Sequence, residues 1–225
     1  MDPITSLSLV GRPYDRIRES ILSGERPSGE RIAAQGIATE LGVSRTPVKE
    51  ALARLDAEGL VVRAGNWGYS VRSVSLRDAE DIFESRLVIE IANARLAAER
   101  ASAAEGTELL AVLKACRAPL KAARLTEFQR RSRAVHEYIS KTTHNLQLMR
   151  MFNQISDLVV LFGISLLRAN PARAAEIYAE NEGIAKAICA GKSADAGALM
   201  RSHIEQGHAS FREAISPTRS SVALW

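Results

Sequence analysis

The segment from Ile37 to Leu55 constrains the fold more than any other part of the chain. Gly42 supplies the sharp turn that ends one helix, and Ser44 is a preferred N-cap residue for the next. Pro47 falls in the first turn of that second helix, where a missing N–H costs nothing. Four apolar residues recur at helical spacing and predict a buried stripe, namely Val48, Ala51, Leu52 and Leu55. The segment therefore predicts a helix-turn-helix.

The other face of the second helix is polar and basic, with Arg45 and Lys49 one turn apart. Arg45 can donate a fork of hydrogen bonds to guanine O6 and N7, and Lys49 offers a point charge for phosphate or guanine. The hydroxyls of Ser44 and Thr46, together with the helix N-terminus, can bind phosphate. We interpret this face as a DNA-reading surface; the alternative is an exposed basic face with no ligand.

A hairpin is predicted directly after the helix-turn-helix. Two short β-type runs, Val61–Arg63 and Tyr69–Arg72, flank a glycine-bounded turn. Such a hairpin would be a wing whose tip lies near the DNA backbone or minor groove. The candidate DNA-binding residues are Gln35, Ser44, Arg45, Thr46, Lys49, Asn66, Trp67 and Gly68.

Glycine and proline are frequent up to Gly68 and rare afterwards, which places a domain boundary near Val71 to Ser75. The first part is expected to hold helices at Pro13–Ser23, Glu30–Leu41 and Arg45–Glu58. The second part is expected to hold six, at Leu76–Ser102, Glu105–Ala118, Thr126–Thr142, Leu146–Arg168, Ala172–Ala190 and Ser193–Ile215, the first N-capped by Ser75. The predicted fold is therefore mainly α: a winged helix-turn-helix over 1–72, an all-helical bundle over 76–216 and a loose tail over 217–225.

Several N-terminal segments resemble the winged helix-turn-helix of the GntR family. They are Tyr14–Gly24, Ser28–Ile32, Val43–Leu52, Glu58–Val61 and Gly68–Val71, in the family's order. The resemblance implies a homodimer that binds a short palindromic operator in double-stranded DNA, with Arg45 and Lys49 in contact with it. One departure is Gly36, which weakens its helix by about 1 kcal/mol relative to alanine.

The helices that follow resemble the effector domain called FCD, on the segments Asp81–Glu90 and Met200–His203 and on His136. In many relatives this bundle holds a divalent metal through an aspartate, a histidine four residues later and two histidines on the last two helices. His136 and His203 match two of these ligands, but Ser132 and Asn181 stand at the other two. The sequence predicts no certain cofactor. His136 and His203 could bind a divalent metal, be polar core residues or line a ligand pocket.

Arg86 lies on the first helix of the bundle among apolar residues. Its guanidinium could grip a carboxylate bidentately, or it could form a structural ion pair with Glu90, one turn on. The stretch Lys114–Arg150 holds nine basic residues against two acidic ones, and could line an anion site or be a solvated face. The candidate effector-binding residues are Arg86, Ser132, His136, Asn181 and His203.

The net charge of +4 is only a weak sign of an anionic partner, because residues 1–72 hold ten Lys and Arg against nine Asp and Glu. Two cysteines without a close-spaced motif favour a reducing cytoplasm, and the nearest apolar run, Leu158–Leu167, is too short to span a membrane. The N-terminus also lacks the features of a secretory signal.

The sequence thus predicts a cytoplasmic, ligand-responsive transcriptional regulator, a repressor, that is modulated by a small anionic effector of the carboxylate type and is not an enzyme. One alternative is a DNA-binding dimer whose effector domain has degenerated. The other is a metal-dependent enzyme, for which the chain shows no nucleophile–base pair and no phosphate loop.

Overall fold

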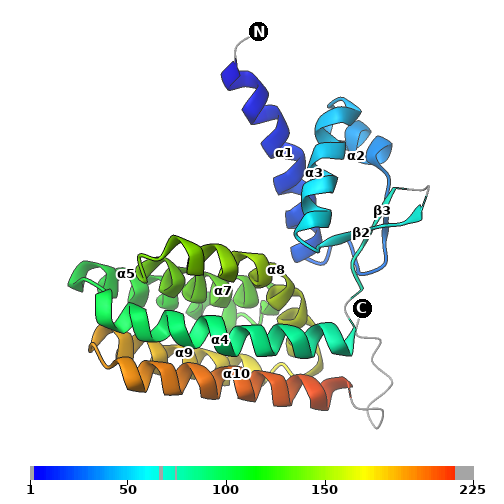
Figure 1. Cartoon of the computed structure of the whole chain (residues 1–225). Coiled ribbons are helices and arrows are strands. Elements are labelled where there is room, and N and C mark those ends of the chain that lie inside the picture. Colours follow the sequence, from blue (N-terminus) through cyan, green and yellow to red (C-terminus); the bar gives the residue numbers. More distant parts are fainter. Residues whose placement is uncertain (1–2, 66–67, 74, 216–225) are drawn as a thin grey trace. The chain divides into compact units, whose positions relative to one another are not determined.

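The computed structural model describes residues 3–65, 68–73 and 75–215, drawn in Figure 1. The chain divides between Val74 and Ser75 into two compact units. Each unit has its own hydrophobic core. The protein therefore consists of an N-terminal unit and a C-terminal unit, each with an architecture of its own.

The N-terminal unit combines helices α1 (Pro3–Leu22), α2 (Ala34–Leu41) and α3 (Arg45–Ala57) with a small antiparallel sheet. The strands are β1 (Arg31–Ile32), β2 (Val61–Arg63) and β3 (Tyr69–Val71), in the order β1-β3-β2. Helix α1 packs against α3, and α2 packs against the same helix. The core between them is apolar and fully buried, and includes Ile17, Ile21, Leu52, Leu55 and Leu60.

Two helix boundaries in this unit differ from the sequence prediction. Helix α1 begins at Pro3 rather than Pro13, so Pro13, which the prediction placed at the helix start, lies inside the helix. The prediction of helix from Glu30 was also wrong. Residues Arg31–Ile32 pair with β3 instead, and the Val71 N–H donates to the Glu30 carbonyl at 2.9 Å. A long-range pairing has overridden the local helical pattern.

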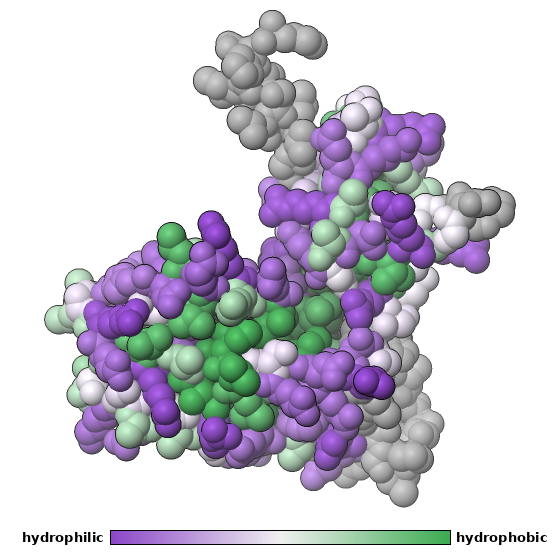
Figure 2. Space-filling model, viewed as in Figure 1, coloured by the Kyte–Doolittle hydropathy of each residue, from purple (hydrophilic) through white to green (hydrophobic). Residues whose placement is uncertain are grey.

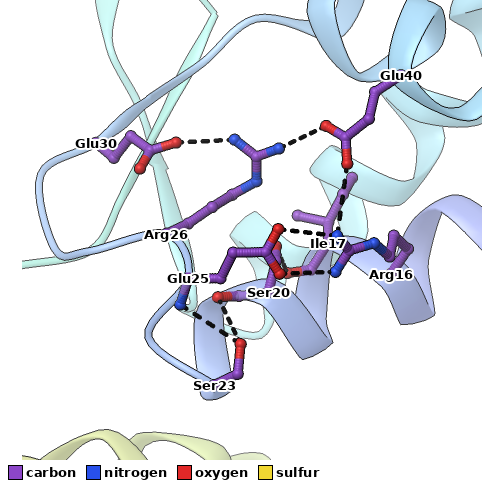
Figure 3. Close-up of polar contacts among 8 residues, drawn as sticks. All are labelled: Arg16, Ile17, Ser20, Ser23, Glu25, Arg26, Glu30 and Glu40. Carbon is purple, nitrogen blue, oxygen red and sulfur yellow. Dashed lines mark hydrogen bonds and ion pairs between the residues drawn. The ribbon is translucent and has the colours of Figure 1, made fainter.

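An ion-pair network ties the turn after α1 to α1 itself and to α2 (Figure 3). Arg16 donates two hydrogen bonds to Glu25, at 2.9 and 2.8 Å. Arg26 donates to Glu30 at 2.8 Å and to Glu40 of α2 at 2.7 Å. Exposed pairs each contribute only about 0–1 kcal/mol, so the network orients α2 more than it stabilises the unit.

The C-terminal unit is all helical. Its helices are α4 (Leu76–Arg100), α5 (Ala103–Lys114), α6 (Arg117–Lys121), α7 (Leu125–Thr142), α8 (Leu146–Ala169), α9 (Arg173–Cys189) and α10 (Ser193–Ile215). Helix α4 packs along α10, α7 packs along α8, and α9 packs against α5 and α10. The long helices run side by side in a bundle (Figure 1).

The short helix α6 was not predicted, because Glu105–Ala118 was expected to be continuous. The helix breaks after Lys114 and restarts at Arg117. Pro119 explains the break, since inside a continuous helix its ring would clash with the carbonyl four residues earlier, whereas a first turn accepts it.

The start of α4 agrees with the prediction that Ser75 is its N-cap. The Ser75 hydroxyl accepts a hydrogen bond from the Asp78 N–H, and the Asp78 side chain accepts one from the Ser75 N–H. This reciprocal pair is a capping box. It begins the long helix within one residue of the boundary between the two units.

Helix α8 is long and apolar enough to cross a membrane by length and composition. In the structure it is a core helix of the bundle, packed against α7 and α4. Its buried residues include the polar Ser156 and Asp157, and Asp157 lies 3.4 Å from Arg133 of α7. Packing inside the C-terminal unit accounts for part of its hydrophobicity, since 44% of its most apolar window is buried.

Candidate functional site

The N-terminal unit presents the predicted DNA-reading residues on one exposed face of α3. Val48, Leu52 and Leu55 are fully buried and anchor the helix to the unit. Arg45, Thr46 and Lys49 are exposed on the other side. The arrangement leaves the guanidinium of Arg45 and the ammonium of Lys49 accessible at the start of the helix, as major-groove reading requires.

The turn before α3 forms as predicted, with one difference. Gly42 adopts the left-handed conformation, with φ of 65°, and ends α2. Ser44 occupies the N-cap position with extended backbone, but its hydroxyl accepts no hydrogen bond from the helix. The predicted side-chain cap was therefore wrong. Because Ser44 is exposed, its hydroxyl points to solvent, where it can reach a DNA phosphate.

The wing needs glycine at position 68. Gly68 has φ of +107°, and a Cβ atom there would lie 2.9 Å from the carbonyl oxygen of Ile32 in the adjacent strand. The two other predicted wing contacts, Asn66 and Trp67, lie outside the described residues. Gln35 is exposed on α2, where its side chain lies 3.4 Å from the Thr39 hydroxyl.

The C-terminal unit contains a partly open cavity of about 60 Å³, bordered by α4, α7, α8, α9 and α10. Arg86, Ser132, His136 and His203, four of the five predicted effector-binding residues, line it. The fifth, Asn181, is 1% exposed and lies behind this lining, where its Nδ2 donates to the Ser132 hydroxyl at 3.0 Å.

Arg86 forms the ion pair with Glu90 that was one of its two predicted roles. Its Nε donates to the Glu90 carboxylate at 2.5 Å, and the same carboxylate accepts from Nδ1 of His136 at 2.5 Å. Within the part of the chain that the structure describes, the two Nη atoms of Arg86 have no hydrogen-bond partner. One side of the guanidinium is thus bound to the protein, and the other is available to the cavity.

The electrostatics of this group keep Glu90 ionised. Burial by itself would raise the pKa of the Glu90 carboxyl, but the positive charge of Arg86 and the hydrogen bond from His136 outweigh it and hold that pKa well below its usual range. An ionised carboxylate can only accept hydrogen bonds, so Nδ1 of His136 carries the proton.

A second buried group mirrors the first. Nδ1 of His203 lies 2.7 Å from Glu180, and Arg173 donates to both oxygens of the same carboxylate. Burial lowers the pKa of His203 to about 4, although the hydrogen bond to Glu180 acts in the opposite direction. A neutral His203 donates from Nδ1 and keeps Nε2 as an acceptor. The rings of His136 and His203 lie 5.0 Å apart.

Sequence reasoning missed Glu180 and Arg173 as parts of the site. The spacing of Arg173, Glu176 and Glu180 is i, i+3, i+7, which places all three on one helix face and was the available signal. Of the nine basic residues between Lys114 and Arg150, only Arg133 lines the cavity, and the other eight are exposed. That stretch is therefore mainly a solvated face.

The rest of the lining is mostly apolar. It includes the aromatic rings of Phe83, Phe152, Phe162 and Phe211. Gly163 makes room for a polar side chain among them, because a Cβ atom at this position would lie 1.9 Å from Nε2 of Gln129. Gln129 is buried, and its Oε1 has no hydrogen-bond partner. It is a further polar group that sequence reasoning did not find.

The divalent metal that the resemblance to the FCD domain implies does not fit these residues. Among the described residues no group of three or more His, Cys, Asp and Glu side chains is arranged to hold a metal ion. Ser132 and Asn181 are hydrogen-bonded to each other, and a hydroxyl and an amide are weak donors for the borderline metals that imidazoles prefer.

Taken together, a winged helix-turn-helix with an exposed basic helix start and a separate bundle with an internal cavity define a class of protein, the DNA-binding regulators with an effector domain. Family models agree in both units. "Bacterial regulatory proteins, gntR family" matches residues 10–71, and "FCD domain" matches residues 81–206. The chain belongs to the GntR family of transcriptional regulators, in the branch that carries an FCD domain.

Individual relatives support the same family. The chain is 28% identical over 210 residues to the transcriptional repressor GlaR of Escherichia coli, covering 89% of this chain and 94% of that protein. It is 28% identical over 147 residues to the regulator YdhC of Bacillus subtilis, and spans 66% of that protein's length and 65% of its own. With a regulator of Agrobacterium vitis it shares 38% identity over 89 residues, spanning 40% of this chain and 52% of that relative.

Solved structures show the same fold. The structure of E. coli McbR/YncC has a TM-score of 0.81 at 21% identity, covering 91% of this chain and 97% of that one. The relatives are transcriptional regulators rather than enzymes, so the prediction of a non-enzymatic DNA-binding regulator is confirmed at this level.

Proposed function

We propose that this regulator is a cytoplasmic repressor that binds a palindromic operator as a homodimer and responds to a small carboxylate. The observation that carries the proposal is the Arg86 guanidinium, which lines an internal cavity with both Nη atoms unpartnered among the described residues. Two parallel N–H donors match the two oxygens of a carboxylate. The relative GlaR, also a repressor by name, supports the direction of regulation.

The surroundings of Arg86 favour one carboxylate and an apolar body. The other two arginines of the lining are already engaged, since Arg173 binds Glu176 and Glu180, and Arg133 binds Glu137 and Ser156. A second negative charge on the effector would therefore find no free cation in this lining. The aromatic walls suit a short branched or aromatic monocarboxylate.

A second copy of the chain is the partner we propose for the apolar face along α4. Val88 of this helix is 74% exposed, and Figure 2 shows other apolar residues gathered over the same face. A two-fold symmetric dimer would match the two halves of a palindromic operator. Replacing Val88 with glutamate should convert the dimer to a monomer in light scattering, whereas glutamate at Leu110, an exposed apolar residue of α5, should not.

Operator binding tests the proposal directly. A gel shift on the protein's own promoter region should show binding to a palindromic sequence, and its absence would contradict the proposal. Coupling of about 1–3 kcal/mol would change operator affinity about 5–150-fold when effector binds. Isovalerate and benzoate are suitable first probes. Arg86→Lys keeps the charge beside Glu90 but removes the fork, so it should bind operator normally and lose the response to the acid.

One observation favours a second candidate, a DNA-binding dimer that needs no effector. Glu90 already neutralises Arg86 at 2.5 Å, so the cavity carries its own counter-ion. A thermal-shift screen with small carboxylates and amino acids separates the two. A ligand at 100-fold excess over its Kd stabilises the fold by about 2.7 kcal/mol, and an effector-independent protein would show no such shift with any of them.

A further inference from the structure

Four buried polar residues lie at or beside the cavity of the bundle. They are Ser132 and His136 of α7, Asn181 of α9 and His203 of α10, the positions at which relatives of the FCD type are expected to hold a divalent metal. Three of these side chains line the cavity, and all four are at most 7% exposed. Any interaction between these side chains therefore lies in the core of the bundle.

A direct hydrogen bond connects the two substituted positions. Asn181 Nδ2 donates to Ser132 Oγ at 3.0 Å, with both residues buried. The bond links α7 to α9 across the interior. The other atom of the amide, Asn181 Oδ1, is buried without a hydrogen-bond partner. Breaking the bond would leave both ends of that amide unsatisfied, which is costly in a core.

The two histidines keep the orientation that metal-binding histidines usually have. Each presents Nδ1 to a carboxylate, Glu90 for His136 and Glu180 for His203. Carboxylates in this position normally orient a histidine so that Nε2 can bind a metal. Here the Nε2 atoms of both rings lack a hydrogen-bond partner among the described residues, and both side chains line the cavity. The carboxylates that orient the two histidines are therefore present, and the chain differs from the expected metal-binding set only at positions 132 and 181.

We propose that the Ser132–Asn181 hydrogen bond takes the structural place of a metal in this bundle, so that the protein folds and binds operator without a divalent ion. Two neutral imidazoles without a carboxylate ligand hold a borderline metal weakly. The cross-link between α7 and α9 is then made by protein atoms alone. This inference concerns the core and holds whether or not a carboxylate effector is found.

Metal titration of the full-length wild-type chain gives the first test. Purified protein should contain far less than one metal ion per chain by mass spectrometry. Neither EDTA nor added Zn²⁺, Mn²⁺ or Ni²⁺ should move its melting temperature or its affinity for operator DNA. Stoichiometric metal in the purified chain, or a melting temperature that rises with zinc and falls with EDTA, would overturn the proposal.

Restoring the two ligands gives the second test. The variant Ser132→Asp/Asn181→His should bind one ion per chain, and its melting temperature should rise by about 5–10 °C at a 100-fold excess of zinc over Kd. Ser132→Asp alone is the matched control, with a smaller rise expected. A double variant that folds by circular dichroism and binds no metal would contradict the assignment of metal loss to these positions.

The variant Ser132→Ala keeps the proposal testable if the double variant does not fold. It removes the acceptor of Asn181 and should lower the melting temperature by about 2–10 °C, equally in EDTA and in zinc. A loss seen only in zinc would mean that a metal, rather than the hydrogen bond, stabilises the wild-type core.

Discussion

The two units place their functional side chains in opposite surroundings. In the N-terminal unit, Arg45, Thr46 and Lys49 are exposed on one helix, whose buried residues are the apolar Val48, Ala51, Leu52 and Leu55. In the C-terminal unit, Arg86 and His136 are 7% exposed, come from different helices and share the buried carboxylate of Glu90. Function and stability are therefore separable for the exposed side chains of α3 and coupled for the buried group around Glu90.

This difference follows from what each site has to recognise. A DNA duplex is large, hydrated and charged, so the side chains that contact it can be exposed to solvent before binding. A small acid must be surrounded, so its ligands are buried, and each buried charge then needs a partner inside the protein. Substitutions in the two units should consequently fail in different ways.

The largest expected effect is on the buried group. Glu90→Ala removes the partner of Arg86 and His136 and leaves a buried guanidinium unpaired, which should cost about 3–5 kcal/mol of unfolding free energy. Urea unfolding followed by circular dichroism measures this. A loss below about 1 kcal/mol would show that solvent reaches the pair and that the coupling between site and stability is weak.

A backbone change in the wing should be the next largest. Gly68→Ala must adopt φ of +107° and brings a Cβ atom against the Ile32 carbonyl, so it should destabilise the N-terminal unit by about 1–3 kcal/mol. Its urea unfolding and its operator affinity should both suffer. If stability were unchanged, the close packing of the wing on β1 would not exist in solution.

Arg45→Ala should change DNA binding without changing stability. Operator binding should weaken by about 1–3 kcal/mol, with specificity relaxed at one base, as measured by fluorescence anisotropy on operator variants. The unfolding free energy should stay within about 0.5 kcal/mol, because the side chain is exposed. Lys121→Ala, an equal change of charge in α6, is the control and should leave specificity intact.

The smallest effect should be a gain. Gly36 lies in α2, and a Cβ atom added at this position would meet nothing within 4 Å, so Gly36→Ala should stabilise the N-terminal unit by up to about 1 kcal/mol. The melting temperatures of Gly36→Ala and Gly68→Ala, each compared with that of the wild type, measure the two effects. Destabilisation by Gly36→Ala would indicate that this helix start needs the freedom of glycine.

The same contrast explains what the sequence could predict. The residues of the DNA face lie within one helix start, so periodicity and capping placed Arg45 and Lys49 correctly without any tertiary information. The partners of the cavity are separated by long stretches of chain, as with Glu180 and His203, or Glu90 and His136. Only the resemblance to a family brought His136 and His203 together, and it gave no sign of Glu180 or Arg173.

Local patterns also failed where distant residues decide the outcome. Arg31–Ile32 reads as the start of a helix until β3 supplies hydrogen bonds to it. Ser44 occupies the N-cap position with extended backbone, yet its hydroxyl makes no hydrogen bond to the helix. The hydrogen bond between Ser132 and Asn181 was not predicted, because the sequence assigned both residues to an effector and nothing in their spacing, 49 residues apart, indicated that they contact each other.

The most direct test of effector-controlled DNA binding is the affinity of the wild-type protein for a fluorescent fragment of its own promoter, titrated with isovalerate and with benzoate in the presence of EDTA. We expect an acid that raises the melting temperature to weaken operator binding about 5–150-fold, with Arg86→Lys unresponsive and EDTA without effect. Operator affinity that is the same with and without an acid that stabilises the protein would contradict this mechanism.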